Sequence, residues 1–515
     1  MHIRRPKMKH SPNVLFHHRR NLHCLQMTGI TIPSDLIGAC LSGNPSPFPA
    51  TPIATRTTPA GDTTRTFDID GDGRGDYAEV AGDDGRVREL RFAPRLDQPG
   101  DPFPPSHESA DAPTRHLLLI LDSIPFELVR AAYARGEFRL FHPPSQVVSP
   151  FPAMTDLCLN EFVGTSPAPG VETQYYDGET LSDGWALYDA EANSPWHTRI
   201  DWHLPYDTHG KVYLAPRRGF QAELARIEQA LADTPVHRFV AYSVGTSALG
   251  FQQGAEGHAF ALAKLERFCR MLVQRARGRL NITLMSDHGH ALGPSRMLDL
   301  RGLLRRGGFP LRTTLAQPHD VVLLDFGLVS MAALHTPSPR AVAEHLARAE
   351  GVELALYRDP AGIHVVDRQG AARIEPCAGG WRYVRAEHDP LALPNSAGAG
   401  LDTCRDADAW FAATNDHIFP DAVDRIGRAF DGLVVHPPDV LLSLADGWHW
   451  GSPFLNRSVR VRGTHGNLCA AGTIGFVMST AGPLPPALRM RDLAPALDRI
   501  GVSVPFARRA IAEPD

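Results

Sequence analysis

The chain has 515 residues, of which 43% are hydrophobic and 21% are charged, and its formal net charge is −5 at pH 7. This length and composition predict a soluble globular protein with two or more domains, or one large decorated domain. The charge gives no electrostatic case for binding nucleic acid or an anionic membrane, and no apolar run approaches the roughly 20 residues of a membrane-spanning helix.

Residues 1–60 are predicted to form a tail. Arg19 and Arg20 precede a weakly apolar run that ends in LIGAC at Cys40, which is typical of an export signal, although Pro33 and Asp35 interrupt the run. The stretch from 41 to 60 is rich in Pro, Ser and Thr and is predicted to be an extended linker. We therefore expect a periplasmic or extracellular location, with a cytoplasmic one as the open alternative.

An acidic loop lies within a predicted compact module, residues 61–100. In DIDGDGRGDYAE, carboxylates stand at loop positions 1, 3, 5, 9 and 12 and a glycine at position 6, namely Asp68, Asp70, Asp72, Asp76, Glu79 and Gly73. These are the positions that surround Ca²⁺ with oxygens in EF-hand-type loops, where the glycine makes the sharp turn. The flanking TTRTF and VRELRF have the pattern of strands. The sequence predicts a small β module that binds a structural Ca²⁺, and the alternative is an acidic solvated turn.

From residue 111 onward, short apolar strands alternate with amphipathic helices. HLLLILD (116–122) is an apolar strand that ends in an acid, and one helical face is formed by Phe220, Leu224, Ile227 and Leu231. Further buried-strand candidates are RFVAYS, LNITLMSD, DVLLSLAD and TIGFVMST. This alternation predicts an α/β domain over 111–515, a three-layer sandwich with a central, mostly parallel sheet between helices.

Side chains that can bind metals follow two of the predicted strands. Asp122 ends the first strand, and Asp287 and His288 follow LNITLM within the stretch SDHGH. Ligands of open α/β sheets bind beyond the C-terminal ends of strands. We therefore prefer a functional site here over a polar turn. His290, in the same stretch, is more often a surface residue or a support behind the ligands than a ligand itself, and it is left out of the predicted set.

Four segments in series resemble the alkaline phosphatase superfamily, in particular its type I phosphodiesterase/nucleotide pyrophosphatase branch. They are Asp122 at its strand end, FPAMTD with Thr155, SDHGH with Asp287 and His288, and RGTHGN with His465. FVGTSPAPG, HGNLCAAGTIGFVMSTAGPL and MRDLAPALDRIGV match further blocks of that branch. The resemblance covers about residues 112–505, with a poorly matching insertion near 295–435.

The resemblance implies metal-dependent cleavage or transfer of a phosphoester, with a phosphodiester as the preferred substrate. Thr155 would be the nucleophile and would form a phosphothreonine intermediate. One Zn²⁺ or Mn²⁺ would be held by Asp122, Thr155, Asp287 and His288. His465 would hydrogen-bond the phosphoryl oxygens or act as an acid or base, and His258 would assist in the cleft. The substrate would be a small-molecule phosphoester or a lipid or glycan phosphate.

The sequence departs from that branch at the second metal site. Two-metal members carry an acid and a histidine in a PDxxGHxxG stretch, and the matching positions here are Ser247 and Phe251. Phenylalanine cannot coordinate a metal and neutral serine is a weak ligand, so the second site is predicted to be lost. We prefer a one-metal enzyme over a catalytically degenerate protein that binds a ligand or partner. A sulfatase relative is disfavoured because PAMTD lacks the C/S-x-P-x-R signature.

The seven cysteines are scattered without CxxC spacing, which argues against a zinc ribbon or a dense disulfide framework. Cys377 and Cys404 lie within one segment and could pair, but the sequence leaves this open. The sequence also leaves open the oligomeric state and the choice between hydrolase and transferase.

Overall fold

The computed structural model describes residues 48–93, 114–182, 194–325, 327–386, 388–394 and 402–504. The predicted export signal and the first part of the predicted linker lie outside these ranges. Within the described ranges, no helix combines the length and the apolar character that crossing a membrane requires.

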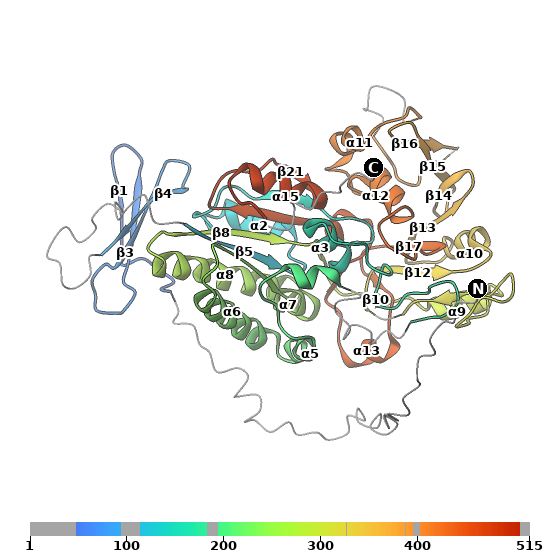
Figure 1. Ribbon diagram of the computed structural model, residues 1–515, viewed down its shortest axis with the longest axis horizontal. Helices are drawn as coiled ribbons and strands as arrows, with labels where there is room; N and C mark the ends of the chain where they lie inside the picture. Colours follow the sequence, from blue (N-terminus) through green and yellow to red (C-terminus); the bar gives the residue numbers. More distant parts are fainter. Residues whose placement is uncertain are drawn as a thin grey trace, which may run out of the picture. The chain divides into compact units, whose positions relative to one another are not determined.

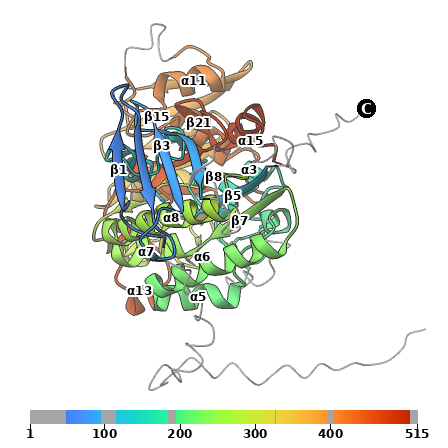
Figure 2. The same cartoon turned by 90° about the vertical axis from the view of Figure 1, so that its left-hand side faces the viewer.

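The N-terminal module is a four-stranded antiparallel sheet in the order β1-β2-β3-β4 (Figure 1 and Figure 2). Its strands are β1 (Ala54–Thr57), β2 (Thr63–Phe67), β3 (Tyr77–Ala81) and β4 (Val87–Phe92). Strands are present where TTRTF and VRELRF predicted them, but the linker prediction is wrong for β1. Its four exposed residues have no apolar pattern, and they are ordered by pairing with β2.

The central sheet has six strands in the order β21-β6-β20-β8-β5-β7. They are β5 (Arg115–Leu121), β6 (Ser145–Val148), β7 (Arg238–Ser243), β8 (Leu280–Ser286), β20 (Ile474–Ser479) and β21 (Ala487–Arg489). Strand β5 pairs in parallel with β7 and β8, whereas β20 is antiparallel to both β6 and β8. Because β21 is again parallel to β6, β20 is the one strand of the six that runs against the others, and the prediction of a mostly parallel sheet is confirmed. Parallel pairing needs a crossover back to the starting edge, and the chain between β8 and β20 forms a second sheet instead.

Helices cover both faces of β5, as its continuous apolar sequence predicts. Leu117, Leu119 and Leu121 pack in one hydrophobic cluster with α2 (Phe126–Ala134), α6 (Pro216–Asp233) and α8 (Ala255–Arg275). Leu118 and Ile120 pack in another with α3 (Thr155–Val163) and α15 (Met490–Arg499). The predicted apolar face of the helix that contains Phe220 is buried within α6. Shorter elements near the site are η2 (Pro195–Arg199), α5 (Tyr206–Leu214) and α7 (Gly245–Gln253).

The second sheet has seven strands in the order β11-β12-β17-β13-β14-β15-β16, and all its pairs are antiparallel. The strands are β11 (Val322–Leu323), β12 (Met331–His335), β13 (Val352–Asp359), β14 (Gly362–Val366), β15 (Ala371–Cys377), β16 (Gly380–Arg385) and β17 (Val440–Leu444). The buried strand predicted in DVLLSLAD is β17, so it belongs to this sheet and not to the central one.

Helices and short strands complete this part of the chain (Figure 1). The helices are α9 (Leu300–Arg306), α10 (Pro339–Leu346), α11 (Ala407–Thr414), α12 (Ala422–Ala429), α13 (Pro453–Ser458) and α14 (Ala470–Thr473). The short strands are β9 (Ala291–Leu292), β10 (Arg296–Met297), β18 (Trp448–His449) and β19 (Gly463–Thr464). A disulfide joins Cys377 to Cys404, which answers the question of their pairing.

Candidate active site

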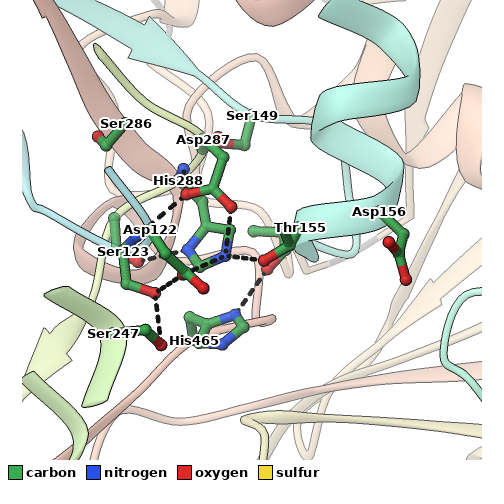
Figure 3. A network of polar contacts seen from close by, with 12 residues as sticks. Asp122, Ser123, Ser149, Thr155, Asp156, Ser247, Ser286, Asp287, His288 and His465 are labelled. Atoms are coloured by element: carbon green, nitrogen blue, oxygen red, sulfur yellow. Dashed lines mark hydrogen bonds and ion pairs between the residues drawn. The ribbon is translucent and has the colours of Figure 1, made fainter. Parts of the chain in front are cut away.

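The two parallel strands β5 and β8 bring three of the predicted residues to one edge of the central sheet. Asp122 directly follows β5, and Asp287 and His288 directly follow β8. The last residues of the two strands pair with each other, so the segments that follow begin side by side. Thr155 is the first residue of α3. Figure 3 shows the side chains of these four residues turned toward one another.

The distances between the donor atoms fit a single metal ion. His288 Nε2 lies 3.4 Å from Thr155 Oγ1, 3.4 Å from Asp287 Oδ2 and 3.8 Å from Asp122 Oδ1. Donors around a tetrahedral ion with bonds of about 2.0–2.2 Å are roughly 3.3–3.6 Å apart. Apart from its contact with His288, Asp287 Oδ2 is buried without a hydrogen-bond partner. A cation at this point would satisfy that oxygen.

Burial sets the electrostatics of the site. Asp287 and His288 are 0% exposed and Asp122 is 5% exposed. Burial, with the neighbouring charge of Asp122 as the next cause, raises the pKa of Asp287 to about 8. Burial also lowers the pKa of His288, and it lowers the pKa of His465 to about 4. A divalent cation would stabilise two carboxylates that lie close together away from solvent, and the neutral imidazoles can bind such a cation.

Hydrogen bonds hold the two carboxylates in place. The Tyr242 hydroxyl donates to Asp122 Oδ2 at 2.6 Å, and the Ser123 hydroxyl donates to Asp122 Oδ1 at 2.5 Å. The Ser123 backbone N–H donates to Asp287 Oδ1 at 3.0 Å. His288 Nδ1 lies 2.9 Å from the Gly289 carbonyl, which makes Nδ1 the protonated nitrogen and leaves Nε2 for a metal.

His465 lies beside this set. Its ring stacks on that of His288, with ring centroids 4.0 Å apart. Its Nδ1 lies 2.9 Å from the Ala153 carbonyl, just before Thr155. A histidine that donates Nδ1–H to a carbonyl presents Nε2 as an acceptor. The structure therefore places a neutral imidazole beside the segment that carries Thr155.

The positions of the predicted lost site make other contacts. Ser247 Oγ accepts a hydrogen bond from the Tyr213 hydroxyl at 3.1 Å and lies 3.4 Å from Ser123 Oγ. The Phe251 ring packs against that of Tyr213, with centroids 6.0 Å apart. The loss of a second site at these positions stays a prediction.

The structure places His258 against His290, inside the protein. Its side chain is 0% exposed and packs against His290, with ring centroids 5.4 Å apart. Asp287 and His288 are buried to the same degree, so burial alone does not decide the role of His258, and its assistance in the cleft stays a prediction. Helical spacing placed His258 near the site correctly, but the packing of α8 against α7 directs the ring inward.

The acidic loop brings together three of its five predicted ligands. Asp68, Asp70 and Asp76 have the spacing of metal ligands. Asp72 lies outside this group and accepts the Arg74 backbone N–H at 2.8 Å. Glu79 is also outside the group, so it does not complete the loop as predicted. Calcium binding by this loop stays a prediction.

The physical reason for the departure of Glu79 is the start of β3 at Tyr77. The strand alternation directs Glu79 and Tyr77 to the same, inner face. There Glu79 accepts the Tyr77 hydroxyl at 3.1 Å and contacts Arg270 at 3.2 Å. In an EF-hand the same loop position begins a helix, and its side chain returns to the ion.

The sequence analysis did not identify Ser123 and Tyr242 as the residues that hold the Asp122 carboxylate in place. A signal for Tyr242 existed, because it lies near the end of RFVAYS, and parallel pairing sets it opposite Ile120, close to Asp122. Ser123 carried no comparable signal, since its role depends on a backbone with a φ of 64° that turns it toward both carboxylates.

The sequence matches no family model and no curated protein. Similar solved structures include the murine ectonucleotide pyrophosphatase/phosphodiesterase 5, with 12% identity, a TM-score of 0.39, and coverage of 76% of this chain and 96% of that one. The human ectonucleotide pyrophosphatase/phosphodiesterase 5 has 13% identity, a TM-score of 0.39 and coverage of 76% and 95%. An inactive variant of the murine protein in complex with AMP has 13% identity, a TM-score of 0.38 and coverage of 75% and 94%. Likeness at this level carries no argument about function, which must rest on the geometry of the site.

Proposed function

We propose that the protein is a metal-dependent phosphoesterase that cleaves or transfers a phosphodiester with Thr155 as its nucleophile. The observation that supports this is the approach of Thr155 Oγ1 and Asp287 Oδ2 to the same imidazole nitrogen of His288. A hydroxyl at that point has the partners that a nucleophilic threonine needs. Asp122 is the fourth member of the set.

One zinc or manganese ion fits the four donors, and when bound it would stabilise the threonine alkoxide and neutralise charge on the phosphoryl oxygens. Thr155 also lies at the N-terminus of α3, where backbone N–H groups and the helix dipole favour an anion. The chain itself therefore binds and orients the phosphoryl group next to the nucleophile.

The reaction has two displacements at phosphorus. In the first, Thr155 Oγ1 forms a bond to phosphorus, the leaving-group oxygen departs with its electron pair, and a phosphothreonine remains. In the second, water or an acceptor hydroxyl attacks the same phosphorus and the Thr155 oxygen leaves. His465 Nε2 accepts the Thr155 proton in the first displacement and returns it to the departing Thr155 oxygen in the second. Solvent supplies the proton of the first leaving group and takes the proton of the attacking water or hydroxyl.

A phosphodiester is the preferred substrate class because a site with one cation stabilises less negative charge than a site with two. A dianionic monoester would need the additional charge. The alcohol part belongs to a small molecule, a lipid or a glycan. The Cys377–Cys404 disulfide favours an oxidising compartment, which supports a periplasmic or extracellular location.

The test is turnover of bis(p-nitrophenyl) phosphate by Thr155→Ala, with Thr155→Ser as the matched control. We expect Thr155→Ala to lose at least about 1,000-fold in kcat/KM, because the nucleophile is gone. Thr155→Ser retains a hydroxyl and should keep measurable turnover. An unchanged rate in Thr155→Ala would refute the nucleophile, and absence of turnover in the wild type with every added metal would favour a binding protein.

A further inference from the structure

His258 and His290 form a buried pair next to the proposed ligand set but outside it. His258 is 0% exposed and His290 is 2% exposed. Both nitrogens of both rings lack a hydrogen-bond partner, which is unusual for buried imidazoles. A buried polar atom without a partner costs about 1–3 kcal/mol. Two such rings in contact point to a bound ligand that accepts nitrogen lone pairs.

The two rings have the separation of ligands on one ion. Their centroids are 5.4 Å apart with an angle of 65° between the planes. Two imidazoles on a tetrahedral ion, with bonds of about 2.0–2.1 Å, have ring centres about 5 Å apart. The pair therefore needs little rearrangement to share a metal.

Gly250 shows which nitrogens face each other. A Cβ built on this glycine would lie 2.2 Å from His258 Nε2 and 2.9 Å from His290 Nδ1. Both nitrogens thus approach the same point on α7, and any side chain at 250 would collide with them. The glycine is what allows the two rings to converge.

The surroundings suit neutral imidazoles that bind a metal. Burial lowers the pKa of His258 to about 4, so this ring is neutral at pH 7.

We propose that His258 Nε2 and His290 Nδ1 bind a second transition-metal ion, for which zinc is the best candidate. An imidazole donor set suits zinc and copper and excludes calcium and magnesium. The nearest further imidazole is His465, whose ring centroid lies 5.9 Å from that of His290. The three rings do not form a ligand group in their present orientations, so we assign the ion two protein ligands, His258 and His290, and leave its remaining positions to solvent.

The experiment counts zinc in a protein that lacks the first site. Asp122→Asn/Asp287→Asn removes both carboxylates of the Thr155 site, and zinc is measured by inductively coupled plasma mass spectrometry after equilibration and dialysis. We expect one zinc ion per chain, and none when His258→Ala or His290→Ala is added. The matched control is His449→Ala, because His449 is buried but both of its nitrogens contact protein partners, Ser295 and Asn456. This control should not change the zinc content.

Cobalt substitution gives a second readout that does not depend on removing a histidine. In the same carboxylate variant, bound Co²⁺ should show visible absorption bands of a nitrogen-ligated ion. Absence of both zinc and these bands in a variant with a native circular dichroism spectrum would overturn the inference. Zinc that persists after both histidine substitutions would overturn it as well. Neither result would change the dependence of turnover on Thr155. The zinc counts therefore test the second metal site, and the Thr155 variants test the proposed function.

Discussion

At the scale of single residues, Asp122 is held by contacts on both its side chain and its backbone. Its carboxylate accepts the hydroxyls of Ser123 and Tyr242. Its backbone N–H donates to the Ser243 carbonyl at 3.1 Å, and its carbonyl accepts the Thr246 hydroxyl at 2.7 Å. These contacts fix the direction of its oxygens before any cation binds, which lowers the cost of assembling the site.

Tyr242→Phe tests this support. The substitution removes the 2.6 Å hydrogen bond to Asp122 Oδ2 but keeps the buried ring. We expect the zinc affinity, measured by competition with a chelator, to fall by about 10–100-fold. Tyr213→Phe is the matched control, because the Tyr213 hydroxyl donates to Ser247 and not to Asp122. An equal loss in both variants, or no loss in either, would contradict the assigned support.

The apolar runs placed Asp122, Asp287 and His288 at the ends of strands, whereas Thr155 joined the predicted set only through the resemblance to the family. The directions of Glu79 and His258 could not be predicted in the same way. Each depends on a neighbour that is distant in the sequence, Arg270 for Glu79 and His290 for His258. Spacing along the chain places a residue on an element, but packing decides which way its side chain points.

At the scale of secondary-structure elements, Glu223 in α6 braces the turn that leads from β7 into α7. Its carboxylate accepts the Ser243 hydroxyl at 2.5 Å and the backbone N–H groups of Val244 at 3.0 Å and Gly245 at 2.9 Å. Ser243 in turn accepts the Asp122 N–H. One buried carboxylate therefore links α6 to the end of β7, and the Ser243 carbonyl at that end accepts the N–H of Asp122, which follows the neighbouring β5.

Glu223 predicts a pH dependence of stability. Burial raises its pKa from 4.5 to about 7, so the folded protein holds this proton more tightly than the unfolded chain does. Its contribution to stability is full below pH 4.5 and is lost as the pH rises through about 7. Glu223→Gln, which is permanently neutral, should flatten the fall in unfolding free energy between about pH 5 and about pH 8. The measurement is urea denaturation across that range.

A surface substitution controls for the change in net charge. Glu127→Gln removes the same charge from an exposed position on α2, where the Glu127 side chain is 67% exposed. It should leave the pH dependence as in the wild type. If both variants flatten the profile equally, the dependence comes from net charge and not from the buried carboxylate.

The strands were predictable at this scale, but their pairing was not. Alternating or apolar runs marked β5, β7, β8, β17 and β20. The partners of β17 and β20 depend on the route of the chain through the second sheet, which local patterns do not encode. Strand β1 was missed because its order comes from hydrogen bonds to β2 rather than from burial.

At the scale of the whole molecule, the second sheet accounts for the segment that matched no pattern of the resembled family. The Cys377–Cys404 disulfide joins the end of β15 to the segment that precedes α11, across 27 residues of sequence. A crosslink of this length restricts the unfolded chain and stabilises the folded state by about 3 kcal/mol. None of the four proposed metal ligands lies between the two cysteines.

Cys404→Ser should therefore lower the unfolding free energy by about 3 kcal/mol, measured by urea denaturation, while turnover of bis(p-nitrophenyl) phosphate persists. Treatment of the wild type with a reductant should produce the same loss, since Cys404 is exposed. Loss of turnover in a folded Cys404→Ser protein would show that the second sheet shapes the active site more directly than the geometry indicates.

The central claim is that one cation binds Thr155 Oγ1, His288 Nε2 and an oxygen of each of Asp122 and Asp287. Anomalous X-ray diffraction from zinc-containing crystals, recorded at the zinc edge, tests this claim most directly. We expect an anomalous peak from one zinc ion, about 2 Å from all four donor atoms. A zinc-saturated protein without a peak among these side chains would contradict this claim.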